Sequence, residues 1–328
     1  MYVGRIARSA RNAVLLGSSA IAIAGVAAGA VRVLPWLLDP AVPWRVAGPF
    51  ARGLAAIAME AALLIGWPVG WTIASLQFVE SGEARVHQTL GERPIRTVSR
   101  LAGQGSFLAA VLTAVALVYA RDAGAPGRVA NELLAHARAS CSAVRTPSTY
   151  AVPFTDLTWL CSPGKEPLLV GSPTRALQSA IVSAKDARIA GDFRALELDD
   201  ARGLLRGPPR IAFHVASLSM RGMAPWAQAS SVPPPLRAFI LVLTAWAAAS
   251  LGAYAVLRHA VRTRIGVLVL GTGGPLGALG LMRLLERLGA RPIAFVLVPL
   301  ASAACTLATA ALLVGWRSLR GRDPAAST

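Results

Sequence analysis

Charged residues are scarce in this chain of 328 residues, at 15% of the composition. Soluble globular proteins carry about 25%. Lysine is almost missing, because Lys165 and Lys185 are the only two among 33 basic residues. With 55% hydrophobic residues, this composition argues against a chain that consists only of soluble globular domains.

Motifs of the common enzyme classes are also missing. The four histidines, His87, His136, His214 and His259, are too widely spaced to indicate a metal site. No G-x-S-x-G elbow of a serine hydrolase is present. The glycine-rich run 271–277 resembles a phosphate loop, but it lacks the Lys-Ser/Thr pair of a Walker A motif and lies within an apolar block. We therefore expect no enzyme, metal or cofactor, and interpret these glycines as small residues that let helices approach closely.

The formal net charge is +17, which raises the question of a nucleic-acid partner. Such partners are indicated when basic residues form one stripe or patch. Here the arginines gather at the ends of apolar blocks, where positive charge sets the orientation of a membrane protein. We expect no nucleic-acid partner.

Long apolar blocks dominate what is present. Each of the six is about long enough to cross a bilayer as a helix. They cover approximately residues 13–31, 53–79, 101–120, 238–257, 265–282 and 292–316. The first follows three arginines, as a signal peptide would, but it is too long for the apolar part of one, so we interpret it as an uncleaved helix.

The arginines in the short connections predict the orientation of these helices. Segments 1–12, 80–100, 258–264 and 317–322 hold thirteen arginines, whereas 32–52 and 283–291 on the other side hold six. Both termini and the 80–100 segment are therefore expected in the cytoplasm. The polar region 122–235 is expected on the far side of the membrane.

That polar region divides the chain into residues 1–121, 122–235 and 236–328, with three helices on each side of it. Helical spacing over 126–139 predicts a helix. The following short runs, bounded by Pro, Gly, Asp or Lys, predict a β-sandwich or jelly roll. Their ranges are 149–160, 167–170, 180–189, 193–198 and 210–219. The expected fold class is membrane α plus β.

A few residues stand out as candidates for a role. Cys141 and Cys161 both lie in the polar region, where an oxidising compartment permits a disulfide, but they could equally be small buried residues. Glu60 lies within an apolar block, where an acid usually faces a cavity or a partner, and it is a candidate for contact with a lipid. It could instead snorkel or pair with Arg52. Arg32, at the outer end of the first block, is expected to anchor at headgroup level or to contact an anionic lipid.

Two short motifs and this layout resemble the lipopolysaccharide-export permeases (LptF/LptG). One motif is Glu83-Ala-Arg-Val-His-Gln-Thr-Leu-Gly91, which follows a proline-bearing second block and is similar to the cytoplasmic coupling helix of that family. We place that helix at about 81–90. The other motif covers 181–200 and is similar to paired strands of the periplasmic β-jellyroll of the family.

The resemblance implies a permease subunit of an ABC transporter that extracts lipopolysaccharide from the bacterial inner membrane. Glu83, Arg85 and Gly91 would couple the chain to a cytoplasmic ATPase dimer that hydrolyses the ATP, and Arg32 would meet the lipid. Further implied partners are a second permease subunit and a periplasmic bridge protein. The alternative is a membrane-anchored binding, sensory or mechanotransmitting protein without transport activity.

Overall fold

The computed structural model describes residues 3–38, 42–143, 145–151, 156–172, 180–191, 193–205, 211–221 and 230–320. Its residues form two compact units. The first unit contains residues 1–28, 55–118 and 231–328, and the second contains 29–54 and 119–230. The second unit therefore includes residues 29–54, which the three-part division placed with the membrane helices.

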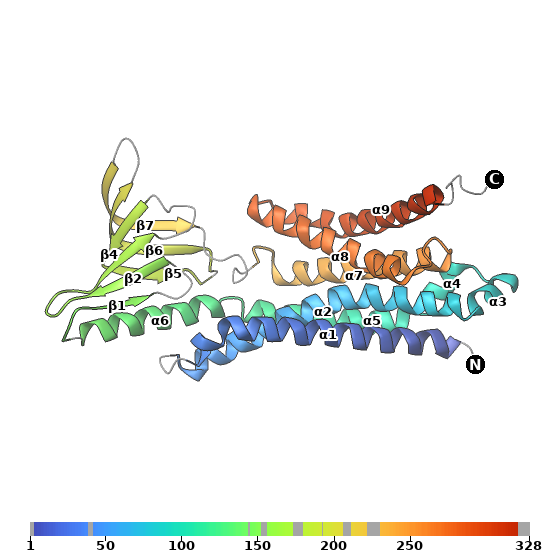
Figure 1. Cartoon of the computed structure of the whole chain (residues 1–328), viewed down its shortest axis with the longest axis horizontal. Coiled ribbons are helices and arrows are strands. Elements are labelled where there is room, and N and C mark those ends of the chain that lie inside the picture. The colour runs from blue at the N-terminus through green and yellow to red at the C-terminus, as the bar shows by residue number, and fades with distance from the viewer. Residues whose placement is uncertain are drawn as a thin grey trace, which may run out of the picture. The chain divides into compact units, whose positions relative to one another are not determined.

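Among the residues that the structure describes, six helices are long and apolar enough to cross a membrane, in agreement with the six predicted spans of a multi-pass membrane protein. Figure 1 shows these helices among the labelled elements. They are α1 (Val3–Leu37), α2 (Trp44–Glu80), α5 (Ala102–Arg121), α7 (Pro234–Leu257), α8 (Arg264–Arg287) and α9 (Leu297–Arg320). The 3₁₀ turn η3 (Pro292–Val296) leads into α9, and the span that contains α5 continues into α6 (Ala125–Ser142).

The starts of these helices follow local chemistry. Pro233 precedes α7 and Pro234 begins it, a place where the missing N–H of proline costs nothing. The Thr263 hydroxyl accepts the backbone N–H of Gly266 at 3.2 Å and so caps α8. Between the long helices, α3 (Glu83–Thr89) and α4 (Pro94–Ser99) form the connection from α2 to α5.

The first unit has a core rich in indole rings. Trp67 and Trp71 of α2 are fully buried, and their rings lie 5.8 Å apart in an edge-to-face arrangement. Trp246 of α7 lies 5.5 Å from the Trp67 ring. Such edge-to-face pairs add directional attraction to the burial of apolar surface. The rings fix how α2 and α7 pack on each other.

Glycines of α8 allow its neighbours to approach closely. A side chain at Gly274 would meet Thr306 Oγ1 of α9 at 2.3 Å, and one at Gly277 would meet Cys305 Sγ at 2.6 Å. At Gly271 it would lie 2.8 Å from the Val69 backbone of α2. The glycine-rich run is therefore a helix-packing surface, as predicted, because helices in a membrane associate through small residues.

The second unit contains one curled antiparallel sheet of seven strands. The strands are β1 (Ser148–Ala151), β2 (Asp156–Cys161), β3 (Leu168–Ser172), β4 (Ala180–Ala184), β5 (Asp186–Ile189), β6 (Ala195–Leu205) and β7 (Ile211–Arg221). Pairing runs from β1 through β2, β3 and β4 to β6, which also pairs with β5 and β7. Two of the predicted runs, 149–160 and 180–189, each contain two strands rather than one.

Strand β6 pairs with β5 over its first part and with β4 over its second part. The change of partner occurs at Asp200 of β6 and at Lys185, which lies between β4 and β5. Asp200 has a positive φ of 50°, which is uncommon for a residue other than glycine. Its carboxylate binds Lys185 Nζ at 3.0 Å and His214 Nε2 at 2.5 Å. The hydrogen bond with His214 has the largest effect on the pKa of Asp200, and together with the bond from Lys185 it lowers this pKa to about 2. The contacts among Lys185, Asp200 and His214 hold the bend where the sheet exchanges partners.

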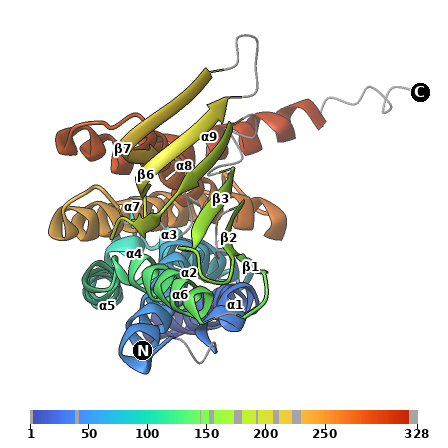
Figure 2. The ribbon, with the colours of Figure 1, turned by 90° about the vertical axis from the view of Figure 1, so that its left-hand side faces the viewer.

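Helix α6 covers the apolar face of this sheet. Leu134 and Ala130 of α6 join a buried cluster with Trp159, Leu169 and Leu196 of the strands. In Figure 2 the β6–β7 ribbon is drawn further from α6 than β1 and β2 are. Cys141 near the end of α6 is bonded to Cys161 of β2, with 4.9 Å between their Cα atoms. Covalent and apolar contacts thus join helix and sheet.

Candidate functional site

The α3 segment is a short helix set between two sharp turns. Gly82 precedes α3 with φ 78°, and Gly91 follows it with φ 80°. Glycine adopts this left-handed conformation without steric cost. Pro94 then starts α4 at its first helical position. The helix falls within the predicted 81–90 range, and Gly91 has a structural reason to be glycine.

Glu83 ties α3 to the first helix of the bundle. Arg5 NH1 of α1 donates to Glu83 Oε1 at 2.6 Å. The Glu83 side chain is 14% exposed, and its Oε2 is buried without a hydrogen-bond partner among the described residues. A buried carboxylate oxygen without a partner is costly, so this carboxylate has unused capacity to accept a hydrogen bond.

The other end of α3 is tied to α7. Gln88 Nε2 donates to the backbone carbonyl of Leu257, the last residue of α7, at 3.2 Å. Burial lowers the pKa of His259 in the turn after α7, and the positive charges of Arg262 and Arg85 lower it further. Arg85 of α3 therefore lies near this turn, and the surface there is basic.

A second polar network follows α3. Glu92 accepts from His87 Nδ1 at 2.5 Å and from Arg100 NH1 at 3.2 Å, and it also contacts Arg100 NH2. The His87 ring lies 5.5 Å from the Phe78 ring of α2. The α3 segment is thus fixed to α1, α2 and α7 by named contacts rather than lying loose in solvent.

The exposed surface of α3 carries apolar side chains next to the exposed polar residues Arg85, Gln88 and Thr89. Val86 is 58% exposed and Leu90, four residues later, is 77% exposed; Ile95 of α4 is 57% exposed. Residues four apart share one face of a helix. These three residues lie outside the six spans. Exposed apolar residues grouped in this way are typical of an interaction surface.

Glu60 forms a buried ion pair within the membrane helices. Arg237 NH1 of α7 donates to Glu60 Oε2 of α2 at 2.6 Å, and NH2 contacts Oε1. Glu60 is 7% exposed and Arg237 9%. The suggested pairing of Glu60 with Arg52 is wrong. Arg52 instead binds Asp122 through two hydrogen bonds of 2.6 and 3.0 Å. Charges inside a membrane are expensive and pair with one another, as here.

The remaining sequence candidates lie elsewhere. Cys141 and Cys161 form the disulfide described above, whereas Cys305 is a free cysteine of α9. Arg32 belongs to α1, but its side chain falls outside the described residues. Within the described part of the chain, no group of three or more His, Cys, Asp and Glu residues could hold a metal ion.

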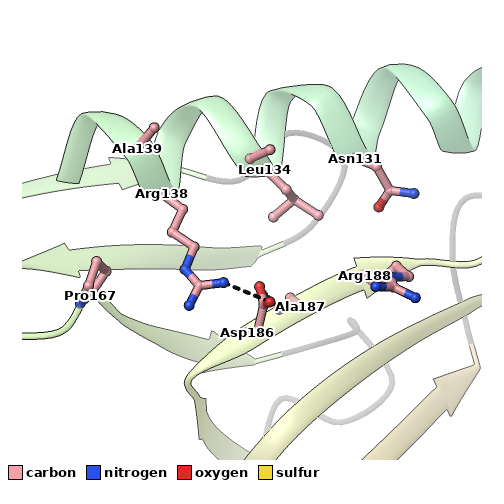
Figure 3. A pocket seen from close by; sticks show the side chains of 9 residues that line it. Asn131, Leu134, Arg138, Ala139, Pro167, Asp186, Ala187 and Arg188 are labelled. Atoms are coloured by element: carbon pink, nitrogen blue, oxygen red, sulfur yellow. Dashed lines mark hydrogen bonds and ion pairs between the residues drawn. The ribbon is translucent and has the colours of Figure 1, made fainter. Parts of the chain in front are cut away.

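A pocket of about 620 Å³ lies between α6 and β5 in the second unit (Figure 3). Arg138 NH1 binds Asp186 Oδ2 across it at 2.7 Å, and Arg188 lines the same space. Asn131 accepts the Ile189 N–H and donates to the Ile189 carbonyl, both at 2.8 Å. Asn131 thereby pairs with the backbone of β5 as a neighbouring strand would.

Comparison with known proteins gives no family: no family model matches the chain, and no curated protein matches it. The function must therefore be argued from the sequence motifs and the geometry above.

Proposed function

We propose that this chain is the permease subunit of an ABC transporter that extracts lipopolysaccharide from the bacterial inner membrane. The observation that carries the proposal is α3, a short helix outside the spans with exposed Val86 and Leu90 on its surface. Its inner side is bound to α1 and α7. A helix with these two sides can accept a partner and pass movement to membrane helices.

In this proposal a cytoplasmic ATPase dimer docks on α3. The apolar Val86 and Leu90 would fit a groove of the ATPase, and Arg85 would contact its surface. Glu83 couples the docked subunit to α1 through Arg5, since the two are joined at 2.6 Å. Gly82 and Gly91 let the short helix turn sharply from α2 and toward α4. ATP hydrolysis takes place in the partner.

The remaining parts of the proposal concern placement and cargo. Both termini and α3 would be cytoplasmic, and the curled sheet would be a periplasmic, jellyroll-like domain. It would pass lipopolysaccharide to a periplasmic bridge protein, and a second permease subunit would complete the cavity. Arg32 would contact the anionic lipid. Because Arg237 already binds Glu60, a lipid could reach the Glu60 carboxylate only by replacing that ion pair.

One observation favours the alternative of a mechanotransmitting protein without transport. Helix α2 is a single element, yet its residues 44–54 belong to the second unit and its residues 55–80 to the first. A helix shared in this way can carry movement between a membrane unit and a polar unit whether or not a lipid is moved. The presence of the cargo is what separates the two functions.

The test is purification of the full chain from its native membranes in mild detergent, with mass spectrometry of bound proteins and lipid. A nucleotide-binding subunit, a second six-helix protein and lipopolysaccharide are expected in the sample. Leu90→Ser should reduce recovery of the ATPase about tenfold, since removing one buried apolar anchor costs on the order of 1–2 kcal/mol.

Leu288→Ser is the matched control, because Leu288 is 72% exposed, close to the 77% of Leu90, and lies in the turn after α8. It should leave ATPase recovery unchanged. An ATPase recovered with no lipopolysaccharide would support the mechanotransmitting alternative. Recovery of the chain alone under conditions that preserve other ABC transporters would overturn both.

A further inference from the structure

A narrow groove between α2 and α8 has properties unlike those of the α3 surface. Its volume is about 280 Å³, at the lower end of the range for small-molecule sites. Leu76 and Val267 form its floor and are buried at 4% and 0% exposure. Ile73 and Leu268 also line it, and Leu268 is 45% exposed. The lining of the groove between its ends is mostly apolar.

The two charged residues of this groove lie at one end of it, and the uncharged polar residue Gln77 lines it next to Leu76. Glu80 is the last residue of α2 and Arg264 the first of α8, and both are exposed. Ile73 lies seven residues before Glu80, about 10 Å along the helix. The groove therefore changes from charged to apolar along the direction of the spans. It does so at the end of the bundle that carries α3, because Glu80 immediately precedes that helix.

The two charges at the mouth are available to a ligand. Among the residues that the structure describes, neither Glu80 nor Arg264 forms an ion pair with another side chain. An arginine binds phosphate through charge-assisted hydrogen bonds, and a carboxylate accepts hydrogen bonds from an ammonium group. One positive and one negative group that line the same groove match a headgroup that carries both charges.

We propose that this groove binds one molecule of a zwitterionic phospholipid with a primary ammonium, phosphatidylethanolamine. Arg264 binds the phosphate, Glu80 accepts from the ammonium, and an acyl chain lies over Leu76 and Val267. Basic pockets between membrane helices are known to recognise lipid headgroups. The carboxylate of Glu80 distinguishes this site from them, because it disfavours a purely anionic headgroup. The site is a property of this chain alone and does not depend on the transport function.

The experiment is native mass spectrometry of the purified full chain in detergent, titrated with three phospholipids of identical acyl chains. They are phosphatidylethanolamine, phosphatidylglycerol and phosphatidylcholine. The parent chain should bind phosphatidylethanolamine most tightly. Arg264→Gln should weaken binding of all three about tenfold, because all contain the phosphate and would lose the charge-assisted hydrogen bonds to it.

Glu80→Gln should weaken phosphatidylethanolamine most, because phosphatidylglycerol has no ammonium and the quaternary ammonium of phosphatidylcholine is attracted by the carboxylate charge but has no N–H to donate. Leu268→Trp, which fills the groove and leaves both charges, should weaken all three. Arg262→Gln is the control for general attraction, since Arg262 is exposed but does not line the groove. It should change each affinity by less than about twofold, far below the factor of ten that 1.4 kcal/mol represents.

Three results would overturn the proposal. One is a parent chain that prefers phosphatidylglycerol. Another is a Glu80→Gln variant that keeps the preference for phosphatidylethanolamine. The third is an Arg262→Gln variant that loses as much binding as Arg264→Gln. Thermal melting of each variant shows that its helices remain folded.

Discussion

Different interactions stabilise the membrane helices of the first unit and the packing of α6 on the sheet in the second unit, which we call the polar unit. In the polar unit, Trp159, Leu169 and Leu196 are buried under α6, and a disulfide joins α6 to β2. Removal of apolar side chains from water stabilises such packing of a helix on a sheet. Among membrane helices the surrounding lipid is as apolar as leucine, and close packing and polar pairs carry more of the stability. The glycines of α8 and the Glu60–Arg237 pair follow this second pattern.

Two ion pairs show the contrast most directly. The side chains of Arg237 and Glu60 are 10% and 9% exposed, whereas those of Arg138 and Asp186 are 46% and 45% exposed. The N–O distances are similar: Arg237 NH1 lies 2.6 Å from Glu60 Oε2, and Arg138 NH1 lies 2.7 Å from Asp186 Oδ2. Exposed pairs gain little because water competes for both groups. Breaking a buried pair leaves a charge without its counter-charge.

The largest effect is expected for Glu60→Gln. Removing the carboxylate that binds Arg237 should destabilise the membrane helices by about 3–5 kcal/mol, because the guanidinium stays buried beside a neutral group. Asp186→Asn is the matched change in the polar unit and should cost less than about 1 kcal/mol. Thermal melting of the helical signal in detergent measures both.

A double variant, Glu60→Gln with Arg237→Gln, removes both charges and should recover part of the loss. If the Glu60→Gln variant has the same melting temperature as the parent, the ion pair does not hold α2 to α7. The contrast between the buried and the exposed ion pair then fails.

The next effect concerns the disulfide. Replacing Cys141 and Cys161 together by serine should destabilise the polar unit by about 2–4 kcal/mol, because the open chain gains freedom when unfolded. Hydrogen exchange should speed up in α6 and β2 and stay unchanged in α7. Cys305→Ser serves as the control, since Cys305 is a free cysteine of α9. Exchange in α6 that matches the parent would show that the apolar contacts alone hold that helix in place.

Local features of this fold follow from the sequence, and pairings across the chain do not. The six spans, the helix within 126–139 and the short helix at 83–89 are set by apolar length, spacing, glycine and proline near each residue. By contrast, Glu60 and its partner Arg237 are 177 residues apart. Arg52 was the nearest opposite charge in sequence, but it binds Asp122, 70 residues away. Periodicity contains no information about which helix faces which.

The strands show the same limit. Residues 180–189 look like one run, but Lys185 separates two strands that pair with different parts of β6. The reason lies in the positive φ of Asp200 on the partner strand, which no pattern within 180–189 reveals. In the same way, two cysteines in one region permit a disulfide, but only the packing of α6 on β2 brings their Cα atoms to 4.9 Å.

The smallest effect tests close packing with two glycines of one helix. Gly274→Ala places a methyl group 2.3 Å from Thr306 Oγ1, 3.0 Å from the Ser302 carbonyl and 3.1 Å from Ala248 Cβ. Such overpacking costs about 1–3 kcal/mol. Gly280 is also in α8, but a methyl group there meets nothing within 4 Å. Gly280→Ala should therefore raise stability by up to about 1 kcal/mol, because alanine favours a helix over glycine.

Opposite shifts of the melting temperature in detergent are thus expected for the same substitution six residues apart, 274 and 280. Equal positive shifts would mean that α8 and α9 are further apart than the structure places them. In that case small residues would not explain the association of these helices, and the contrast with the polar unit would rest on the ion pair alone.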